Sequence, residues 1–583
     1  MAMPPAHGGA ALRAHIAQLL EAAIAQVAPA VDVGALILER PKKAEHGDVA
    51  CSVALQLAKA LKRPPRDIAA ALVAAMPASP SIAKAEIAGA GFINLFLKPG
   101  VKQSIVLQIL ELGNRYGRQP ATAPRRIQVE FVSANPTGPL HVGHGRGAAF
   151  GASLSNVLEA AGHEVTREYY VNDAGRQMDI LALSAWLRYL EALGEQLPFP
   201  PNAYQGEYVR DMARTLHMRD GNRYRRDAAA VCDAIAPGMD AEASIDALIA
   251  NAKLQLGDDY ETLHAYVLEE QLSDCKSDLA DFGVAFDRWY SERSLYDSGR
   301  VERAVLQLQK SGHLFEKDGA LWFRSTSFGD EKDRVVRREN GQFTYFASDI
   351  AYHLDKIERG YGQMIDVWGA DHHGYIPRVK GALQALGADA SRLTVALVQF
   401  AVLYRGGEKM SMSTRSGEFV TLRELRREVG NDAARFFYVL RKSDQHLDFD
   451  LDLAKSQSND NPVYYVQYAH ARVCSLLEQW GGNPEDLTSA DPSTLATEAE
   501  NLLLSHLLEY PDCVVNAARD LAPHVIAFYL RELAAGFHSY YNSTRFLVPE
   551  EPLRLARLAL AVAVRQVLRN GLTLLGVSAP EKM

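Results

Sequence analysis

The chain has 583 residues, which at about 150 residues per domain suggests three to five folding units rather than a lone module. Apolar residues make up 48% and charged residues 23%, close to the averages for soluble globular proteins, so wholesale disorder and fibrous architectures are disfavoured. The net charge of −9 argues against a protein that coats nucleic acid through its overall charge, although a local basic face stays possible.

The composition also carries no signal for export or membrane insertion. The longest uninterrupted apolar run, residues 68–76, is far shorter than the roughly twenty residues that a membrane-spanning helix needs. The first residues lack a basic leader followed by a long apolar stretch. The 5 cysteines are scattered without a CxxC pair, so neither a disulfide framework nor a thiolate zinc site is encoded. We therefore expect a cytoplasmic protein without a structural zinc site or a membrane contact.

The first 120 residues predict a small α+β domain. Residues 10–76 are rich in Ala and Leu at helical spacing, and residues 86–97 indicate a hairpin-like strand region. A proline-flanked link at 118–124 precedes the apolar β-branched run 126–132, which is typical of a buried parallel strand. This change of pattern places a domain boundary near residue 121.

From residue 121 to 449 the chain alternates strands and helices, as a doubly wound α/β parallel sheet does. The runs 363–368 and 393–403 are expected strands, and a mainly helical stretch from about 178 to 280 is an expected insertion. From residue 450 to 583 the pattern turns helical, which predicts an all-α bundle. The fold class is therefore multidomain α/β.

The most informative segment is residues 130–148, which runs from a strand through a Pro/Gly turn into a helix start. Its small residues Gly143, Gly145 and Gly147 would let a ligand approach the backbone, and the first N–H groups of the helix would meet a phosphate. His141 and His144, three apart, can point the same way and donate to a polyphosphate as charge develops.

Three alternatives compete for this segment. Two histidines at this spacing also suit metal ligands or solvated surface groups. The glycines loosely match a dinucleotide fingerprint, but in that motif the first glycine closely follows the strand, whereas residues 133–142 intervene here. Nicotinamide binding therefore ranks low.

A second element lies downstream, where glycines and serines of residues 404–420 predict a mobile loop. Lys409 and Arg415 on this loop would reach over a triphosphate and neutralise departing pyrophosphate. Taken alone, this segment is an ordinary charged loop. Together with the histidine segment, it is a specific signal for such chemistry.

The segments His141-Val-Gly-His144 and Lys409-Met-Ser-Met-Ser413 resemble the two signatures of class I aminoacyl-tRNA synthetases, and the chain resembles the arginyl-tRNA synthetase family. The resemblance covers nearly the whole length. Further segments that carry it are Glu45-His-Gly-Asp48, Gly91-Phe-Ile-Asn94, Ser133-Ala-Asn-Pro136, Tyr170-Val-Asn-Asp-Ala-Gly-Arg-Gln177, Tyr345-Phe-Ala-Ser-Asp349, Trp368-Gly-Ala-Asp-His-His-Gly374 and Ser458-Asn-Asp-Asn-Pro-Val-Tyr-Tyr-Val-Gln-Tyr468. It implies a Rossmann-like catalytic domain and ATP-dependent ligation of L-arginine to tRNA(Arg), with Mg²⁺ carried by the ATP.

The residue types also suit an arginine pocket. A guanidinium is planar, permanently charged and rich in donors, so its natural receptors are carboxylates and amide oxygens. Tyr345 and Asp349, four apart at an expected helix start, would lie on one face, although a capping Asp beside a core Tyr is the plainer interpretation of the pair alone. The resemblance makes both residues readers of the guanidinium, and it places further residues around the arginine: Glu130, Ser133, Asn135, Glu292 and Asp371.

Glu130 lies within the apolar strand, where burying a carboxylate costs free energy unless the carboxylate is paired. We expect a cationic ligand or a cationic partner for it, and Arg126 is one candidate partner.

The resemblance implies an ATP site and a catalytic set. The catalytic set is His141, His144, Lys409 and Arg415, and the other ATP-binding residues are Gly138, Gly143, Gly145, Asp371, His372, Met410 and Ser411. Asp371, His372 and His373 look like metal ligands, yet no HExxH pattern supports a zinc site. The chain departs from the usual loop signature, because no second lysine follows the Met-Ser pair, and Gly138 stands where some relatives carry a lysine.

Contacts with tRNA are expected outside the catalytic domain. Aromatic residues interleaved with arginines in the C-terminal helices suit unstacked bases and phosphates, and we expect a surface at Tyr540, Tyr541 and Arg545. By the resemblance, Phe92 and Asn94 of the N-terminal domain also contact the tRNA. We expect a monomer that does not bind DNA. The competing functions are another class I synthetase, such as one for cysteine, or a catalytically silent tRNA-binding paralogue.

Overall fold

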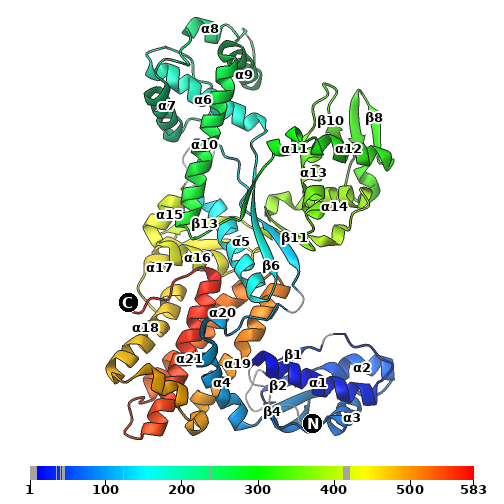
Figure 1. Ribbon diagram of the computed structural model, residues 1–583, viewed down its shortest axis with the longest axis vertical. Helices are drawn as coiled ribbons and strands as arrows, with labels where there is room; N and C mark the ends of the chain where they lie inside the picture. The colour runs from blue at the N-terminus through cyan, green and yellow to red at the C-terminus, as the bar shows by residue number, and fades with distance from the viewer. Residues whose placement is uncertain are drawn as a thin grey trace. The chain divides into compact units, whose positions relative to one another are not determined.

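The computed structural model divides into two compact units, Ala121–Ser456 and a second unit formed by Met1–Pro120 together with Gln457–Met583 (Figure 1). The first and last parts of the chain, which the sequence analysis treats as separate domains, therefore pack as one unit. The structure describes residues 9–34, 36–39, 41, 46–121, 124–236, 238–410 and 420–583.

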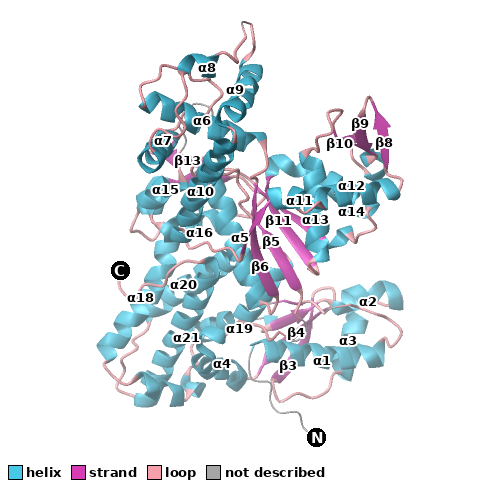
Figure 2. Ribbon diagram, turned by 45° about the horizontal axis from the view of Figure 1, so that its top comes forward, coloured by secondary structure: helices cyan, strands magenta, loops and turns pink. Residues whose placement is uncertain are grey.

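A five-stranded parallel sheet forms the centre of the unit Ala121–Ser456, and Figure 2 shows three of its strands, β5, β6 and β11, side by side. The strands are β5 (Arg126–Glu130), β6 (Glu164–Val171), β7 (Arg288–Ser291), β11 (Gln363–Gly369) and β12 (Leu393–Val398), in the order β12-β11-β5-β6-β7. The chain runs outward from β5 to β7 and then returns to the other side of β5, so the strand order reverses between β5 and β11. Ligands of doubly wound sheets bind at the carboxyl ends of the strands at such a switch point. The predicted doubly wound fold is confirmed.

Helices pack on this sheet so closely that β5 is buried on both faces. Ile127, Val129 and the alternating Gln128 have no exposed surface, and Glu130 is 7% exposed, as expected for a strand covered on each side. A Cβ atom at Gly151 of α5 would lie 2.2 Å from the Phe131 ring, so a larger residue would push this helix away from the end of β5. The covering helices include α5 (Val142–Ala160), α13 (Tyr345–Glu358) and α14 (Ile376–Ala385), and α16 (Asn431–Val439) packs against α5.

The stretch between β6 and β7 is helical, as the sequence predicts for residues 178–280, and Figure 1 shows its helices gathered together. Trp186 lies at its core, with no exposed surface, and donates a hydrogen bond to the carbonyl of Tyr224 over 2.8 Å. The helices are α6 (Arg176–Ala192), α7 (Glu207–Asp220), α8 (Ala228–Cys232), α9 (Ala241–Leu256) and α10 (Asp258–Asp281).

Two features of this unit differ from the sequence analysis. A small antiparallel sheet of β8 (Leu314–Lys317), β9 (Ala320–Phe323) and β10 (Arg334–Arg337) was not expected. The expected single strand 393–403 is two strands in different sheets, because β12 ends at Val398 and β13 (Ala401–Arg405) pairs with β14 (Glu408–Lys409) and β15 (Leu447–Asp450). The remaining helices of four or more residues are α11 (Arg293–Asp297), α12 (Arg300–Lys310), η3 (Ser325–Phe328), η4 (Ala370–Tyr375), α15 (Leu422–Val429) and α17 (Leu451–Lys455).

The other unit combines a small α+β part with long helices. Its antiparallel sheet has the order β1-β2-β4-β3, with strands β1 (Leu38–Glu39), β2 (Val49–Cys51), β3 (Ile82–Ala88) and β4 (Phe92–Leu97). The pairing of β3 with β4 is the hairpin that the sequence indicates at 86–97. The helices are α1 (Gly9–Val27), α2 (Val53–Leu61), α3 (Pro65–Ala75), α4 (Pro99–Leu112), α18 (Pro462–Trp480), α19 (Glu498–Arg519), α20 (His524–Ser543) and α21 (Glu551–Leu575).

Helix α21 is long and apolar enough to cross a membrane by length and composition alone. Within the structure, however, 72% of its apolar window is buried. It packs against α18 and α20, as a core helix of a bundle does.

Candidate functional site

The histidine segment begins helix α5 at the switch point of the sheet. His141 is the residue that caps the helix, and its Nδ1 accepts a hydrogen bond from the Gly143 backbone over 3.1 Å. The Nδ1 of His144 accepts in turn from the His141 backbone over 3.3 Å. The two rings stack with their centroids 3.6 Å apart. The spacing of three residues therefore brings the imidazoles together, as predicted.

These contacts determine the protonation state of the pair. Because each Nδ1 accepts a backbone hydrogen bond, each neutral ring carries its proton on Nε2. Burial lowers the pKa of both rings, and burial together with the charge of His141 lowers the pKa of His144 to about 3. At neutral pH the site therefore holds two uncharged imidazoles, each with one Nε2–H donor.

The glycines of this segment serve different purposes. A Cβ atom at Gly145 would lie 2.7 Å from Leu422 of α15 and 3.0 Å from Tyr438 of α16, so this glycine allows close helix packing. That corrects the expectation that Gly145 is small in order to admit a ligand. Around Gly147, by contrast, a Cβ atom would meet no atom within 4 Å. At Gly143 it would crowd the His141 ring at 2.9 Å, and at Gly138 it would meet the Tyr208 hydroxyl at 3.2 Å.

The segment that follows the signature loop is joined to the histidine segment by backbone hydrogen bonds. Leu422 N–H donates to the carbonyl of Leu140 over 2.8 Å, and Val142 N–H donates to the carbonyl of Val420 over 3.2 Å. His141 and Thr421 thereby form an isolated antiparallel bridge. Before the loop, Lys409 is exposed at the end of β14, and Met410 N–H donates to the carbonyl of Leu403. The predicted residues Ser411 and Arg415, like Glu45, lie outside the described residues.

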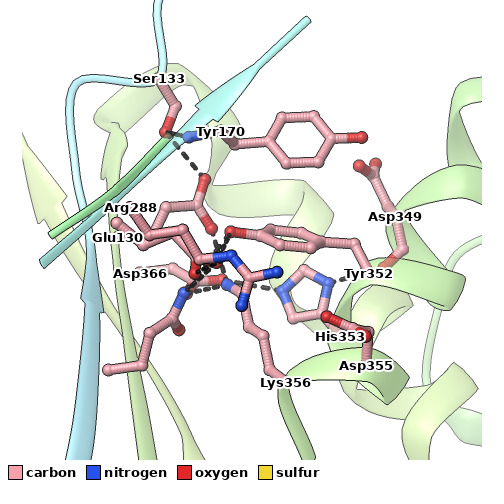
Figure 3. Close-up of polar contacts among 12 residues, drawn as sticks. Glu130, Ser133, Tyr170, Arg288, Asp349, Tyr352, His353, Asp355, Lys356 and Asp366 are labelled. Atoms are coloured by element: carbon pink, nitrogen blue, oxygen red, sulfur yellow. Dashed lines mark hydrogen bonds and ion pairs between the residues drawn. The ribbon is translucent and has the colours of Figure 1, made fainter. Parts of the chain in front are cut away.

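A cavity of about 250 Å³ opens at the carboxyl ends of β5 and β11. One face of α13 lines it, and Figure 3 shows Asp349, Tyr352, His353 and Lys356 of this helix facing the side chains of Glu130 and Ser133. The cavity is lined by Glu130, Val132, Ser133, Tyr170, Asn172, Asp349, Tyr352, His353, Val367, Trp368, Gly369, His372 and Tyr375.

Asp349 is the carboxylate best placed to meet a cation in this cavity. The Tyr375 hydroxyl donates a hydrogen bond to its Oδ2. Removal from water raises the pKa of Asp349, although the bond from Tyr375 opposes that shift. Tyr345 starts α13 as predicted; it is 55% exposed, so it is not a core residue, and it does not line the cavity. The helical spacing places both residues at the start of one helix, as the sequence analysis expects.

Glu292 is buried beside α13. The Ser348 hydroxyl donates to its Oε1 over 2.9 Å. Burial raises the pKa of Glu292 to about 7; the Ser348 bond lowers it, and the charges of Asp349 and Asp173 raise it further. The carboxyl group therefore changes its charge near neutral pH.

We expect arginine to bind more tightly as the pH rises from 6 to 8, by roughly three- to tenfold, because Glu292 becomes an anion in that range. Replacing Glu292 by Gln should flatten this dependence, since an amide does not titrate. The measurement is the arginine Kd by titration calorimetry across that range, with exposed Glu316→Gln as the control that keeps the wild-type profile. A flat profile in the wild-type protein would exclude this role for Glu292.

The cationic partner expected for Glu130 comes from the chain itself. Lys356 of α13, which has no exposed surface, donates to Glu130 Oε2 over 2.6 Å and to Asp366 Oδ1 over 2.7 Å. The candidate Arg126 is wrong, because Arg126 contacts Glu164 and the carbonyl of Arg359 instead. Lys356 was not predicted, and its only signal in the sequence is its place about two turns beyond Asp349 on the same face of the helix.

Opposite charges pair within the buried cluster of Lys356, Glu130 and Asp366. Burial raises the pKa of Glu130, and the Lys356 ammonium opposes that shift. Asp366 has its pKa lowered to about 2, because Lys356 and His353 outweigh its burial. His353 contacts the carbonyl of Asp349 through Nδ1 and the carboxylate of Asp366 through Nε2, both of which accept hydrogen bonds. Lys356 thus contacts both carboxylates of the cluster and His353 contacts that of Asp366, whereas Asp349 accepts from the Tyr375 hydroxyl.

Other predicted residues do not gather in this cavity. Asn135 is exposed and does not line it. Asp371 and His372 are both 61% exposed, and only His372 of the two lines the cavity. Within the part of the chain that the structure describes, no group of three His, Cys, Asp or Glu side chains could hold a metal ion.

Two residues predicted to contact tRNA are buried. Tyr540 has no exposed surface, and its hydroxyl donates to Glu500 over 2.9 Å, so placing it on the surface was wrong. Asn94 is 5% exposed and lies on β4, which is paired on both sides, with β2 and with β3. Tyr541 and Phe92 are half-buried, and Arg545 is exposed.

The doubly wound sheet, the paired imidazoles at a helix start and the carboxylate-lined cavity beside them define a class I aminoacyl-tRNA synthetase. Three family models match in order: "Arginyl tRNA synthetase N terminal domain" at residues 13–97, "tRNA synthetases class I (R), catalytic domain" at 105–213 and 231–447, and "DALR anticodon binding domain" at 466–583. The chain belongs to the arginyl-tRNA synthetase family.

Individual relatives agree with the family models. The chain is 67% identical to an arginine–tRNA ligase of Nitrosospira multiformis, over 93% of this chain and 94% of the relative. It is 63% identical to an arginine–tRNA ligase of Azoarcus sp., over 97% of this chain and 99% of the relative. Among solved structures, it is similar to the arginyl-tRNA synthetase of Thermus thermophilus, with a TM-score of 0.75, 25% identity and coverage of 98% and 100%.

Proposed function

We propose that the chain is an arginine–tRNA ligase, which uses ATP to form arginyl-adenylate and then transfers the arginyl group to tRNA(Arg). The observation that carries the proposal is the Asp349 carboxyl group in a cavity at the sheet's switch point, with a pair of neutral imidazole donors at the start of α5. Membership of the family and 67% identity to an arginine–tRNA ligase over 93% of this chain support the proposal.

In the first step the arginine carboxylate attacks the α-phosphorus of ATP, an oxygen–phosphorus bond forms, and pyrophosphate leaves. Little covalent chemistry falls to the protein, so positioning and charge stabilisation carry the rate. The Nε2–H groups of His141 and His144 would donate to phosphate oxygens as charge develops. Mg²⁺ would enter with the ATP phosphates and neutralise part of their charge.

Arginine would bind with its guanidinium toward α13. Asp349 supplies the carboxylate, the exposed Tyr345 supplies an aromatic wall, and Glu292 adds a second negative charge above pH 7. Lys409 is our first choice for the cation that meets the pyrophosphate, followed by Arg415, since the second lysine of the signature is missing.

We place the tRNA anticodon arm on a surface of α18 and α20. Arg472 lies 5.0 Å from the ring of Tyr468 and 4.5 Å from that of Tyr541, and Tyr464 stacks on Tyr468 at 5.9 Å. Half-buried tyrosines beside an arginine are a stacking platform for unpaired bases.

We also propose that the protein is a cytoplasmic monomer.

Replacing Tyr541 by Ala should raise the KM for tRNA by about 5- to 100-fold, because one stacked base is worth roughly 1–3 kcal/mol. The arginine KM should stay unchanged. The control is the neighbouring Tyr540→Phe, which removes a buried hydroxyl from Glu500 and should lower the melting temperature without changing the tRNA KM. Equal tRNA KM values for wild type and Tyr541→Ala would place the platform elsewhere.

Arginine-dependent ATP–pyrophosphate exchange, measured with tRNA(Arg) present, tests the function directly. Exchange with arginine, and not with cysteine or methionine, supports the proposal. Absence of exchange in a folded protein that still binds the tRNA would favour a catalytically silent paralogue.

A further inference from the structure

The Tyr375 side chain, which lines the cavity, is held by its neighbours as well as by Asp349. Tyr375 is the last residue of η4, and its hydroxyl donates to Asp349 Oδ2. Its ring lies 5.9 Å from the Trp368 ring and meets the Phe346 ring edge-on at 6.2 Å, both measured between centroids. The guanidinium of Arg378 lies 4.7 Å from the centre of the same ring. The ring is therefore held by aromatic contacts and by a cation.

Helical spacing brings Arg378 to this ring. Tyr375 immediately precedes α14, and Arg378 lies three residues further on, within the first turn of that helix. Residues three apart on a helix are neighbours on one face. A guanidinium at this distance is attracted by the negative face of an aromatic ring. The contact is therefore both local and favourable.

Arg378 is itself fixed by a buried carboxylate. Its Nε donates to Asp330 Oδ2 over 3.2 Å, and the Asp330 side chain is only 3% exposed. Arg334 donates to both oxygens of the same carboxylate, over 2.8 Å each. These bonds hold the pKa of Asp330 well below its usual range, so the carboxylate stays charged. An arginine that is bonded at Nε has lost most of its rotamer freedom, so its guanidinium keeps one place beside Tyr375.

The charge of Arg378 also acts on the Tyr375 hydroxyl. Burial and the neighbouring Asp349 raise the pKa of Tyr375, and the charge of Arg378, followed by that of Arg334, opposes this shift. A cation near a phenol favours loss of the phenolic proton, so it makes the hydroxyl a stronger hydrogen-bond donor. The bond from Tyr375 to Asp349 is therefore stronger with Arg378 in place.

We propose that Arg378, anchored by Asp330, is a positioning residue for arginine binding: it holds the Tyr375 ring so that the hydroxyl of this ring orients the Asp349 carboxylate toward the substrate guanidinium. Each link is a direct contact, and Arg378 itself does not line the cavity. The proposal rests on the proposed function, to which it adds a residue outside the pocket.

The first test is Arg378→Met, which removes the charge and the planar group but keeps a long side chain. We expect the arginine Kd, measured by titration calorimetry, and the arginine KM of exchange to rise by about 3- to 10-fold, because the Tyr375 hydroxyl is then less well held. The kcat and the KM for ATP should stay within about twofold of wild type. Arg378→Lys keeps the charge without the planar group, so its Kd should lie between the two.

The matched control is Arg334→Met. This change removes both Arg334 bonds to the Asp330 carboxylate and leaves the guanidinium of Arg378 beside the Tyr375 ring. It should lower the melting temperature and change the arginine Kd by less than about twofold. An equal rise in Kd for Arg334→Met and Arg378→Met would attribute the effect to stability around Asp330 and would overturn the proposal.

A double-mutant cycle with Tyr375→Phe tests whether Arg378 acts through the hydroxyl. Residues that act through one shared contact are not additive, so Arg378→Met should change the Kd by less than about twofold in the Tyr375→Phe background. A full further loss in that background, or a wild-type Kd for Arg378→Met alone, contradicts the positioning role. If Arg378→Met does not fold, Arg378→Lys replaces it in the cycle. A wild-type protein that binds no arginine would instead contradict the proposed function, so the two failures are distinguishable.

Discussion

Asp349→Asn is expected to raise the KM for arginine by at least about a hundredfold and to leave the KM for ATP within about twofold. The guanidinium would lose its charge-assisted bonds to a carboxylate in a site removed from bulk water, and breaking such a pair typically costs about 3–5 kcal/mol. Lys356 already bonds both Glu130 and Asp366, so neither carboxylate of that cluster can replace Asp349. Steady-state exchange kinetics with varied arginine and varied ATP provide the measurement.

Two further measurements test the role of Asp349. Tyr375→Phe removes the hydroxyl that donates to Asp349 but keeps the charge, so its arginine KM should rise by no more than about tenfold. Asp349→Asn should also melt at the same temperature as wild type or higher, because the free protein no longer holds a desolvated carboxylate. An arginine KM unchanged by the substitution would remove Asp349 from the pocket.

His144→Ala is expected to lower kcat by about 10²–10³-fold with a smaller change in the KM for ATP. The Nε2–H donor acts on charge that develops at the phosphates in the transition state, and removal of one such donor typically has this effect. Single-turnover formation of arginyl-adenylate measures the step directly.

The pH profile of kcat provides a second test of the role of His144. The pKa of His144 is lowered to about 3, so the ring stays neutral from pH 5 upward and contributes no acid limb to the pH profile of kcat in that range. His144→Gln keeps an N–H donor near the position of Nε2 and should recover part of the rate. Activity of His144→Ala equal to that of wild type would contradict the assigned role.

Much of the fold was predictable because its signals are local. The β-branched run 126–132 identified a buried parallel strand, and the i, i+3 spacing of His141 and His144 correctly predicted that their rings lie together. The hairpin β8–β9 was missed although Asp318 and Gly319, both with positive φ, form the Asp-Gly turn that typically joins such strands. The run 393–403 was read as one strand because its hydrophobicity does not show where a chain leaves one sheet for another.

The candidate site was less predictable because its contacts are distant in sequence. Lys356 meets Glu130 across 226 positions, and no local pattern marks a buried lysine as the partner of a particular carboxylate. The same limit applies to Tyr540, which is buried, and Tyr541, which is half-buried, because one position on α20 decides which ring enters the core.

The backbone bridge between Leu140–Val142 and Val420–Leu422 constrains how this enzyme can diversify. An insertion or deletion within either stretch would shift its register against the other and misalign both catalytic signatures at once. Among descendants of this gene, length changes should therefore accumulate outside these two short stretches, and second-site suppressors of a defect at His141 should map to the beginning of α15.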